Sequence, residues 1–172
     1  MHKLEHVWRL YATRTRIKSS REATVQDWEN TLDFVSTIAT VEDFWSVFNS
    51  LKRPSDLHNR AAYFLFKQEI LPEWEHPRNE RGGAWHLNFA NVEKVNDVWL
   101  AALLAVVGHQ LGELMTHVCG LVMTVKGNKH RLSLWLDDDG VALELGQALK
   151  PIVSGHALVY KKHHSEQPRL TL

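Results

Sequence analysis

The chain has 172 residues, of which 44% are hydrophobic and 23% charged, and this composition excludes a wholly disordered or fibrous protein. Its 20 lysines and arginines balance 20 aspartates and glutamates, so any contact with nucleic acid must come from a local patch. The single cysteine, Cys119, excludes an intrachain disulfide and a zinc site made of several cysteines, and it fits a reducing compartment.

The first half of the chain predicts four strands and one helix. The strands are short runs of β-branched and aromatic residues at 7–13, 31–36, 63–67 and 84–89. The helix is expected to begin at Thr40, because a hydroxyl followed three residues later by an acid, Asp43, is a typical capping pattern. Apolar residues then recur at helical spacing; they are Val41, Phe44, Trp45, Phe48 and Leu51.

The second half predicts two more helices and three strands. One helix covers 92–107 and ends at Gly108, and a weaker one covers 141–150, capped by Asp138 or Asp139 and ended by Pro151. The strands are expected at 118–126, 131–136 and 156–161. The polar tail, 163–172, is expected to fray. The longest apolar run, Trp99 to Gly108, is too short to cross a bilayer, so we predict an intracellular protein.

Strand order and patterning together predict the fold class. In 131–136, Leu132, Leu134 and Leu136 alternate with other residues, so one face of this strand is apolar. A four-residue connection, 127–130, is short enough for a hairpin with 118–126. Because strands outnumber helices and the helices lie apart in sequence, we predict an α+β fold. One antiparallel sheet carries helices on one face, in a single domain over 1–172.

Two of the seven tryptophans lie in segments that are too polar or too rich in proline for a core. Trp74 and Glu75 follow Pro72 in a predicted loop. An indole beside a carboxylate can hold a flat cationic heterocycle, because the ring stacks on it and the carboxylate accepts its N–H groups. Trp28, in the polar stretch 24–30, is a candidate second ring. The alternative is that both indoles cover the core and that Glu75 is solvated.

The hairpin predicted around 127–130 has a basic end. A four-residue turn would place Lys126 opposite Arg131, with Lys129 at the tip. Like charges directly opposite each other cost up to about 1 kcal/mol, which suits a site where a phosphate bridges them. The alternative is a solvated hairpin end. Arg81-Gly82-Gly83 is a weak RNA-binding signal, and a turn that leads into the next strand explains it better.

Sequence motifs of catalysis are missing. We find no P-loop, no Gly-x-Ser-x-Gly and no His-Glu-x-x-His motif. The acidic run 137–139 lacks the spacing of a calcium loop and fits a turn with a helix cap. The steps of four from His109 to His117 are interrupted by Gly112, which argues against a helix there. We therefore predict a protein that is not an enzyme and that has no metal or cofactor.

Taken together, a set of motifs in fixed order resembles the eukaryotic mRNA cap-binding translation initiation factor 4E family. The motifs are Thr40-Val-Glu-Asp-Phe-Trp, Trp74-Glu75, Asn79-x-Arg81-Gly82-Gly83-x-Trp85, Trp99-Leu100 with Leu103-Leu104, Val118-Cys119-Gly120, and the hairpin that ends in Trp135. The resemblance is densest from Trp28 to Trp135. It implies a curved antiparallel sheet of about eight strands with three helices on its convex face.

The resemblance also implies a ligand, the 7-methylguanosine 5′ cap of mRNA, on the concave face. It aligns Trp28 and Trp74 with two stacking tryptophans and Glu75 with the carboxylate that pairs with the guanine edge. Lys126 and Arg131 align with two phosphate-binding cations. The family usually has arginine at the first of these positions and lysine at the second, so the bidentate grip should shift toward Arg131.

A helical peptide partner is implied for the convex side. By resemblance, Val41, Trp45, Leu100 and Leu104 form the groove for the Tyr-x4-Leu-Φ helix of a 4G-type scaffold protein or a 4E-binding repressor. The implied function is cap binding and scaffold recruitment in translation initiation, in the cytoplasm, with a nuclear pool left open. The alternative is a divergent isoform that acts as a translational repressor or interaction module with altered cap preference.

Overall fold

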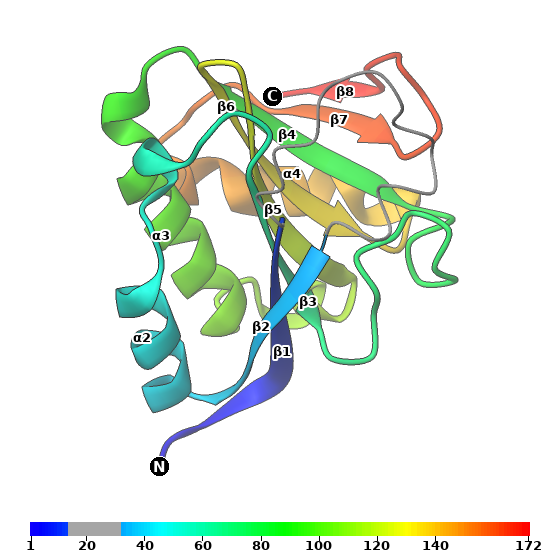
Figure 1. Ribbon diagram of the computed structural model, residues 1–172. Coiled ribbons are helices and arrows are strands. Elements are labelled where there is room, and N and C mark those ends of the chain that lie inside the picture. Colours follow the sequence, from blue (N-terminus) through cyan, green and yellow to red (C-terminus); the bar gives the residue numbers. More distant parts are fainter. Residues whose placement is uncertain (14–31) are drawn as a thin grey trace.

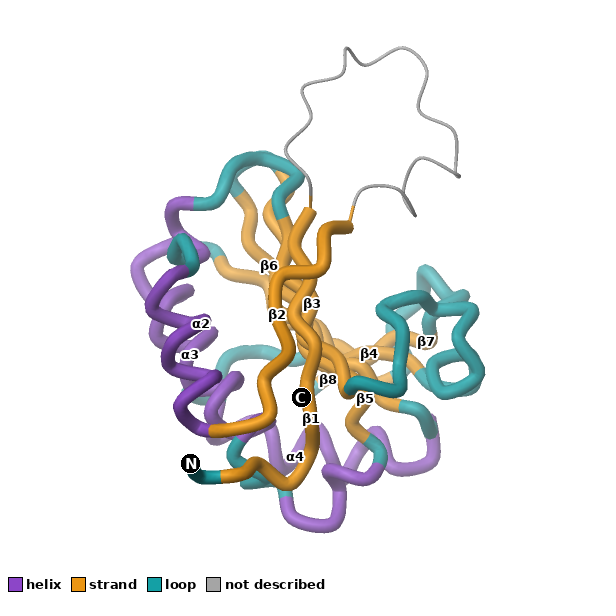
Figure 2. Tube along the Cα trace, turned by 60° about the horizontal axis from the view of Figure 1, so that its bottom comes forward, coloured by secondary structure: helices purple, strands orange, loops and turns teal. Residues whose placement is uncertain are grey.

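The structure is a computed structural model that describes residues 1–13 and 32–172. In this part of the chain, one antiparallel sheet has the strand order β2-β1-β3-β5-β6-β4-β7-β8. The strands are β1 (Lys3–Thr13), β2 (Leu32–Thr40), β3 (Ala62–Lys67), β4 (Gly83–Phe89), β5 (Val118–Lys126), β6 (Lys129–Leu136), β7 (Val159–Lys162) and β8 (Leu170–Thr171). Helices α2 (Val41–Ser50), α3 (Val95–Val107) and α4 (Ala142–Ile152) lie on the convex side of the curved sheet (Figures 1 and 2). The predicted α+β class is confirmed.

Helix α2 begins at the predicted capping box. The Thr40 hydroxyl accepts a hydrogen bond from the Asp43 N–H (3.1 Å), and the Asp43 carboxylate accepts one from the Thr40 N–H (2.9 Å). These bonds satisfy backbone donors that the first turn leaves without an intrahelical partner. They fix the direction in which the chain leaves β2 and therefore which side chains of α2 face the sheet.

The other two helices are each preceded by a short 3₁₀ turn. The turn Val92–Lys94 leads into α3, which stops at Gly108 as predicted. Asp138 caps the turn before α4 by accepting from the Gly140 N–H (2.7 Å). Helix α4 runs one residue past Pro151, so the predicted stop was slightly early. A proline in the last turn removes only one backbone hydrogen bond, which this helix end tolerates.

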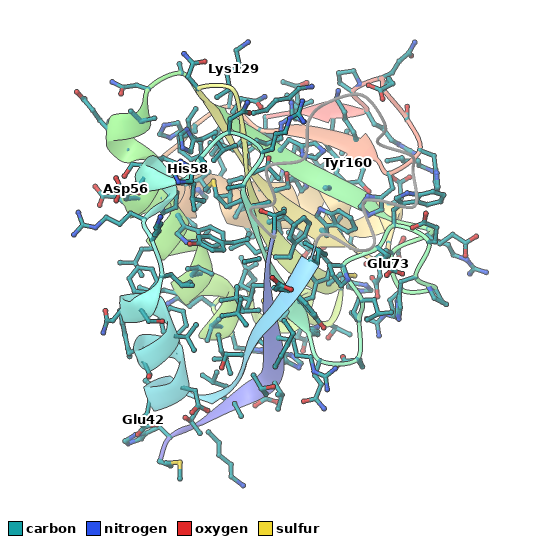
Figure 3. The ribbon with its side chains drawn as sticks, in the orientation of Figure 1. Glu42, Asp56, His58, Glu73, Lys129 and Tyr160 are labelled. Atoms are coloured by element: carbon teal, nitrogen blue, oxygen red, sulfur yellow. The ribbon has the colours of Figure 1, made fainter. Side chains whose placement is uncertain are left out.

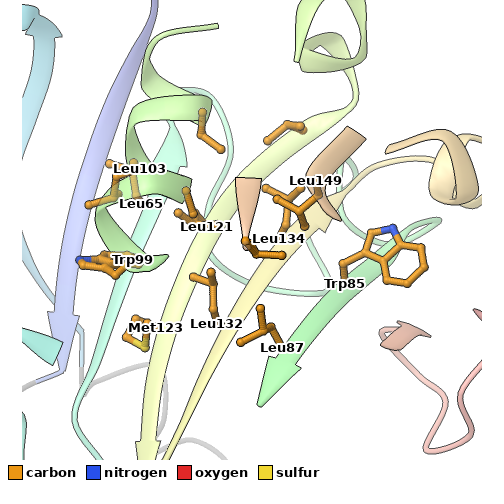
Figure 4. Close-up of a cluster of buried hydrophobic side chains, with 14 of the residues drawn as sticks. Leu65, Trp85, Leu87, Trp99, Leu103, Leu121, Met123, Leu132, Leu134 and Leu149 are labelled. Atoms are coloured by element: carbon orange, nitrogen blue, oxygen red, sulfur yellow. The ribbon is translucent and has the colours of Figure 1, made fainter. Parts of the chain in front are cut away.

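The main core lies between the sheet and the helices. The predicted alternation in β6 is confirmed, because Leu132, Leu134 and Leu136 are all buried in this cluster. Figure 4 shows leucines of β3, β5 and β6 packed together with Trp99 and Leu103 of α3 and Leu149 of α4. The indole N–H of Trp85 donates to the Ala142 carbonyl (2.7 Å), which ties β4 to α4.

The turn of the β5–β6 hairpin differs from the prediction. Lys126 pairs with Lys129, so the loop has two residues and not four, and Arg131 lies opposite Thr124. The expectation that Lys126 faces Arg131 was wrong. Gly127 has a φ of +64°, a conformation that glycine adopts without strain and that a tight two-residue hairpin turn requires at its first position.

Strand β8 was not predicted. It pairs with β7, and beyond it Leu172 exchanges two backbone hydrogen bonds of 2.9 Å with Leu158. The sequence analysis placed this segment in a polar tail, because two residues are too few to show a period of two. None of the helices in residues 1–13 and 32–172 is long and apolar enough to span a membrane.

Candidate functional site

The concave face of the sheet, which the helices leave free, carries side chains in three rows. Paired residues on neighbouring antiparallel strands project to the same face, so the strand register defines the rows. The first row is Phe66, Gly120, Trp135, Ala84 and Lys161; the second is Phe64, Val122, Ser133, His86 and Val159; the third is Ala62, Thr124, Arg131 and Asn88. The rows change from aromatic at one end to cationic and polar at the other.

The first row holds two aromatic rings, of which Phe66 is fully buried and Trp135 is half-buried. The rings of Phe66 and Trp135 meet edge to face, with centroids 5.3 Å apart. Gly120 lies between them in the sheet, and a Cβ added to it would be only 2.5 Å from the Phe66 ring. The absence of a side chain at Gly120 therefore lets the two rings approach each other.

Trp74 and Glu75 lie in the loop between β3 and β4, and both are exposed, the indole to 45%. Asn79 holds this loop from inside, because it is fully buried and its amide donates to the carbonyls of Leu71 (3.0 Å) and Glu73 (2.6 Å). The loop, drawn on the right of Figure 2, is thus fixed while Trp74 stays accessible. An exposed indole in a fixed loop fits a binding role better than a core lid.

An ion pair anchors the same loop to Asp137, the residue that directly follows β6. The Arg78 guanidinium lies 2.7 Å from the Asp137 carboxylate and donates to the Thr116 carbonyl. The other carboxylate oxygen of Asp137 is 2.9 Å from Nδ1 of His117. Asp137 therefore connects the loop to the segment that precedes β5.

We expect Asn79→Ala to loosen this loop without unfolding the sheet. The change removes two hydrogen bonds, each worth about 0.5–1.5 kcal/mol. Hydrogen–deuterium exchange should show faster exchange of the amides in 71–82 and unchanged exchange in β3 and β5. Arg81→Ala is the matched control, because Arg81 is exposed in the same loop and its side chain forms no hydrogen bond or ion pair in the described part of the chain. Wild-type exchange in Asn79→Ala would contradict the prediction.

Two histidines connect Trp74 to the first row, and sequence reasoning missed both. The ring of His163 packs on Trp135 and the ring of His164 packs edge-on against Trp74, each with centroids 4.2 Å apart. Burial lowers the pKa of His163 to about 4, so this ring is neutral at physiological pH. No local pattern could reveal these contacts, because they depend on where the segment after β7 folds back.

The cationic end of the concave face comes from the hairpin. Nε of Arg131 donates to Oδ1 of Asn88 (2.8 Å), which orients the guanidinium. Arg131, Lys126 and Lys129 are all exposed, and none of them forms an ion pair with a described residue (Figure 3 labels Lys129 at the hairpin end). The site residues predicted here thus lie on one hairpin, although Lys126 and Arg131 are not directly opposite.

A polar pair occupies the middle row, and no local sequence pattern indicated it. Nδ1 of His86 lies 2.8 Å from Oγ of Ser133. Burial first, and then the charges of Arg131, Lys161 and His163, lower the pKa of His86 to about 4. His86 is therefore a neutral hydrogen-bonding group between the aromatic row and Arg131.

Trp28 lies outside the described residues, so the predicted pair of stacking indoles remains a prediction. Glu75 and Trp74 are both exposed, so Trp74 does not cover the core, and the role of Glu75 stays a prediction. Gly112 has a φ of +59° and begins a 3₁₀ helix, Gly112–Thr116, so the segment is helical but His109 to His117 do not share one α-helical face. Among the described residues, no group of three or more histidine, cysteine or acidic side chains could hold a metal ion.

A second surface lies on the convex side, where α2 and α3 are neighbours (Figure 1). Phe44 is buried and Phe48 half-buried, whereas Val41 and Trp45 are each 39% exposed. The Trp45 ring is held edge-on against Phe48, with centroids 5.8 Å apart. Leu100 and Leu104 of α3 are half-buried at the edge of the core. The sequence did not show which apolar residues of α2 are buried and which are exposed. In the structure Phe44 packs into the core, and Val41 and Trp45 therefore face outward.

A curved sheet with an aromatic row and free cations on its concave face defines a ligand-binding protein of the α+β class. The family model described as "Eukaryotic initiation factor 4E" matches residues 3–170. The chain belongs to this family.

Relatives from plants and nematodes support this assignment. Eukaryotic translation initiation factor 4E-1 of Arabidopsis thaliana is 37% identical over 134 residues, which are 78% of this chain and 54% of that protein. The complex of C. elegans eIF4E-3 with the 4E-binding protein Mextli and a cap analog has a TM-score of 0.88 and 34% identity, covering 99% of each chain. Ascaris suum eIF4E-3 in complex with m7G cap has a TM-score of 0.87 and 32% identity, covering 99% of this chain and 97% of that one.

Proposed function

We propose that this protein binds the 7-methylguanosine 5′ cap of mRNA and recruits a scaffold protein for translation initiation, as a single non-catalytic domain in the cytoplasm. The observation that carries the proposal is Trp74, an exposed indole in a fixed loop, beside an exposed carboxylate and next to the aromatic row. The cap complexes of the nematode relatives support the same ligand.

The chemistry of a methylated guanine suits these residues. Methylation at N7 makes the base a delocalised cation, which stacks more strongly on an indole and donates better to a carboxylate. Trp74 supplies one stacking surface and Glu75 accepts hydrogen bonds from the guanine edge, and we propose Trp28 as the second stacking surface. His164 contacts the Trp74 ring edge-on and so lies beside the proposed stacking surface.

The direct test is a titration with 7-methyl-GTP and with GTP, followed by tryptophan fluorescence. Stacking should quench the emission, and 7-methyl-GTP should bind far more tightly than GTP. Glu75→Ala should lose most of that preference. Equal affinity for the two nucleotides in the wild-type protein would exclude cap recognition.

Arg131→Ala is expected to weaken binding of 7-methyl-GTP by about tenfold, because one charge-assisted contact to a phosphate is lost. The slope of log affinity against log salt concentration should fall by about one. Affinity for the nucleoside 7-methylguanosine, which has no phosphate, should not change. An equal loss for nucleoside and triphosphate would show that Arg131 does not contact the phosphates.

On the convex side, we propose that Val41, Trp45, Leu100 and Leu104 bind a Tyr-x4-Leu-Φ helix of a 4G-type scaffold or a 4E-binding repressor. The exposed apolar side chains of α2, beside the half-buried leucines of the adjacent helix α3, suit the apolar face of an amphipathic helix. The C. elegans relative in complex with a 4E-binding protein supports a partner of this type. Peptide binding without cap binding would favour the alternative of a repressor or interaction module.

A further inference from the structure

The middle row of the concave face holds a polar pair that the proposed base and phosphate contacts do not use. His86 and Ser133 lie between apolar neighbours in this row, among them Val122 and Val159. Nδ1 of His86 is bonded to Ser133, and its other ring nitrogen, Nε2, has no hydrogen-bond partner among residues 1–13 and 32–172. Nε2 is not buried, so water bonds to it in the free protein and a ligand on the concave face can take the place of that water.

Ser133 can fix the orientation of the imidazole. Its side chain is almost fully buried, at 4% exposed, whereas His86 is half-buried. A ligand on the concave face can therefore reach the histidine and not the serine. The bond to Nδ1 holds the ring with Nε2 as the free hydrogen-bonding atom.

The spacing of the rows places this atom between the two ends of a bound nucleotide. Strands rise by about 3.3 Å per residue, so Trp135 in the first row and Arg131 in the third are separated by about 13 Å along β6. Ser133 and His86 lie halfway. If the base occupies the first row and the phosphates the third, the group over the middle row is the sugar.

We propose that His86 is a ribose-binding residue, whose Nε2 bonds to the 2′- or 3′-hydroxyl of the methylguanosine, and that Ser133 positions it. This inference rests on the proposed function and deepens it. A neutral imidazole suits a hydroxyl, because a hydroxyl both donates and accepts and so pairs with either tautomer of the ring. A phosphate oxygen, which only accepts, would favour a charged imidazole, and burial keeps His86 neutral.

The test compares 7-methyl-GTP with its 2′-deoxy and 3′-deoxy forms by fluorescence titration. The wild-type protein should bind the ribonucleotide about threefold to tenfold more tightly than at least one deoxy form, the effect of one hydrogen bond. His86→Leu should bring that ratio to about one, because it weakens the nucleotides that carry the contacting hydroxyl and leaves the form that lacks it unchanged. Ser133→Ala should reduce the ratio partly. His58→Leu is the matched control, because this exposed histidine lies before β3, away from the concave face (Figure 3).

Each contrary result has a distinct meaning. A wild-type ratio of one for both deoxy forms, with clear binding of 7-methyl-GTP, overturns the ribose site and leaves cap binding intact. Equal weakening of all three nucleotides in His86→Leu shows a structural role and overturns it too. A loss that grows with the number of phosphates assigns His86 to the phosphates instead. No quenching by any methylated nucleotide removes the proposed function and this inference together.

Discussion

Trp74→Ala is expected to lower the affinity for 7-methyl-GTP by about thirtyfold to a hundredfold, the largest effect of any single change on the concave face. Losing one stacking surface for a cationic base removes about 2–3 kcal/mol. The indole is 45% exposed, so its removal should leave the thermal unfolding midpoint almost unchanged. Isothermal titration calorimetry is the suitable measurement, since the variant loses a fluorescent reporter.

The control for this variant lies on the opposite side of the sheet. Trp45→Ala removes an indole of similar exposure, 39%, from α2. It should bind 7-methyl-GTP like the wild-type protein. If Trp45→Ala weakened nucleotide binding as much as Trp74→Ala, the loss would report general destabilisation and not a stacking contact.

Trp45→Ala is expected to weaken binding of a Tyr-x4-Leu-Φ peptide by about thirtyfold or more, the size typical of a tryptophan at the centre of an interface. The ring is held edge-on against Phe44 and Phe48, so little conformational entropy is lost when a peptide covers it. Fluorescence anisotropy of a labelled peptide measures the change.

Trp74→Ala is the reciprocal control, and it should bind the peptide normally. Peptide affinity that survives Trp45→Ala would place the partner surface elsewhere. The two variants thus separate the concave and convex surfaces, which share the sheet but no side chain.

Much of the candidate site could be predicted from local sequence. The Thr40–Asp43 capping box, the alternation in β6 and the pairing of Trp74 with Glu75 all depend on residues a few positions apart. The register of the hairpin could not be predicted from the sequence. The same residues are compatible with a two-residue turn and with a four-residue turn. The structure has the two-residue turn, so the cross-strand partner of Lys126 is Lys129 and not Arg131.

The sequence by itself determined that this chain folds as one sheet with helices on one face, and which segments carry the indole, the carboxylate and the cations. Only the tertiary structure decided which of these residues share a surface. His86 and Ser133 are 47 residues apart yet are hydrogen-bonded. His164 meets Trp74 because it lies just after β7, which pairs with β4 at the end of the Trp74 loop. Spacing along the chain sets the face on which a side chain projects, whereas strand order sets its neighbours.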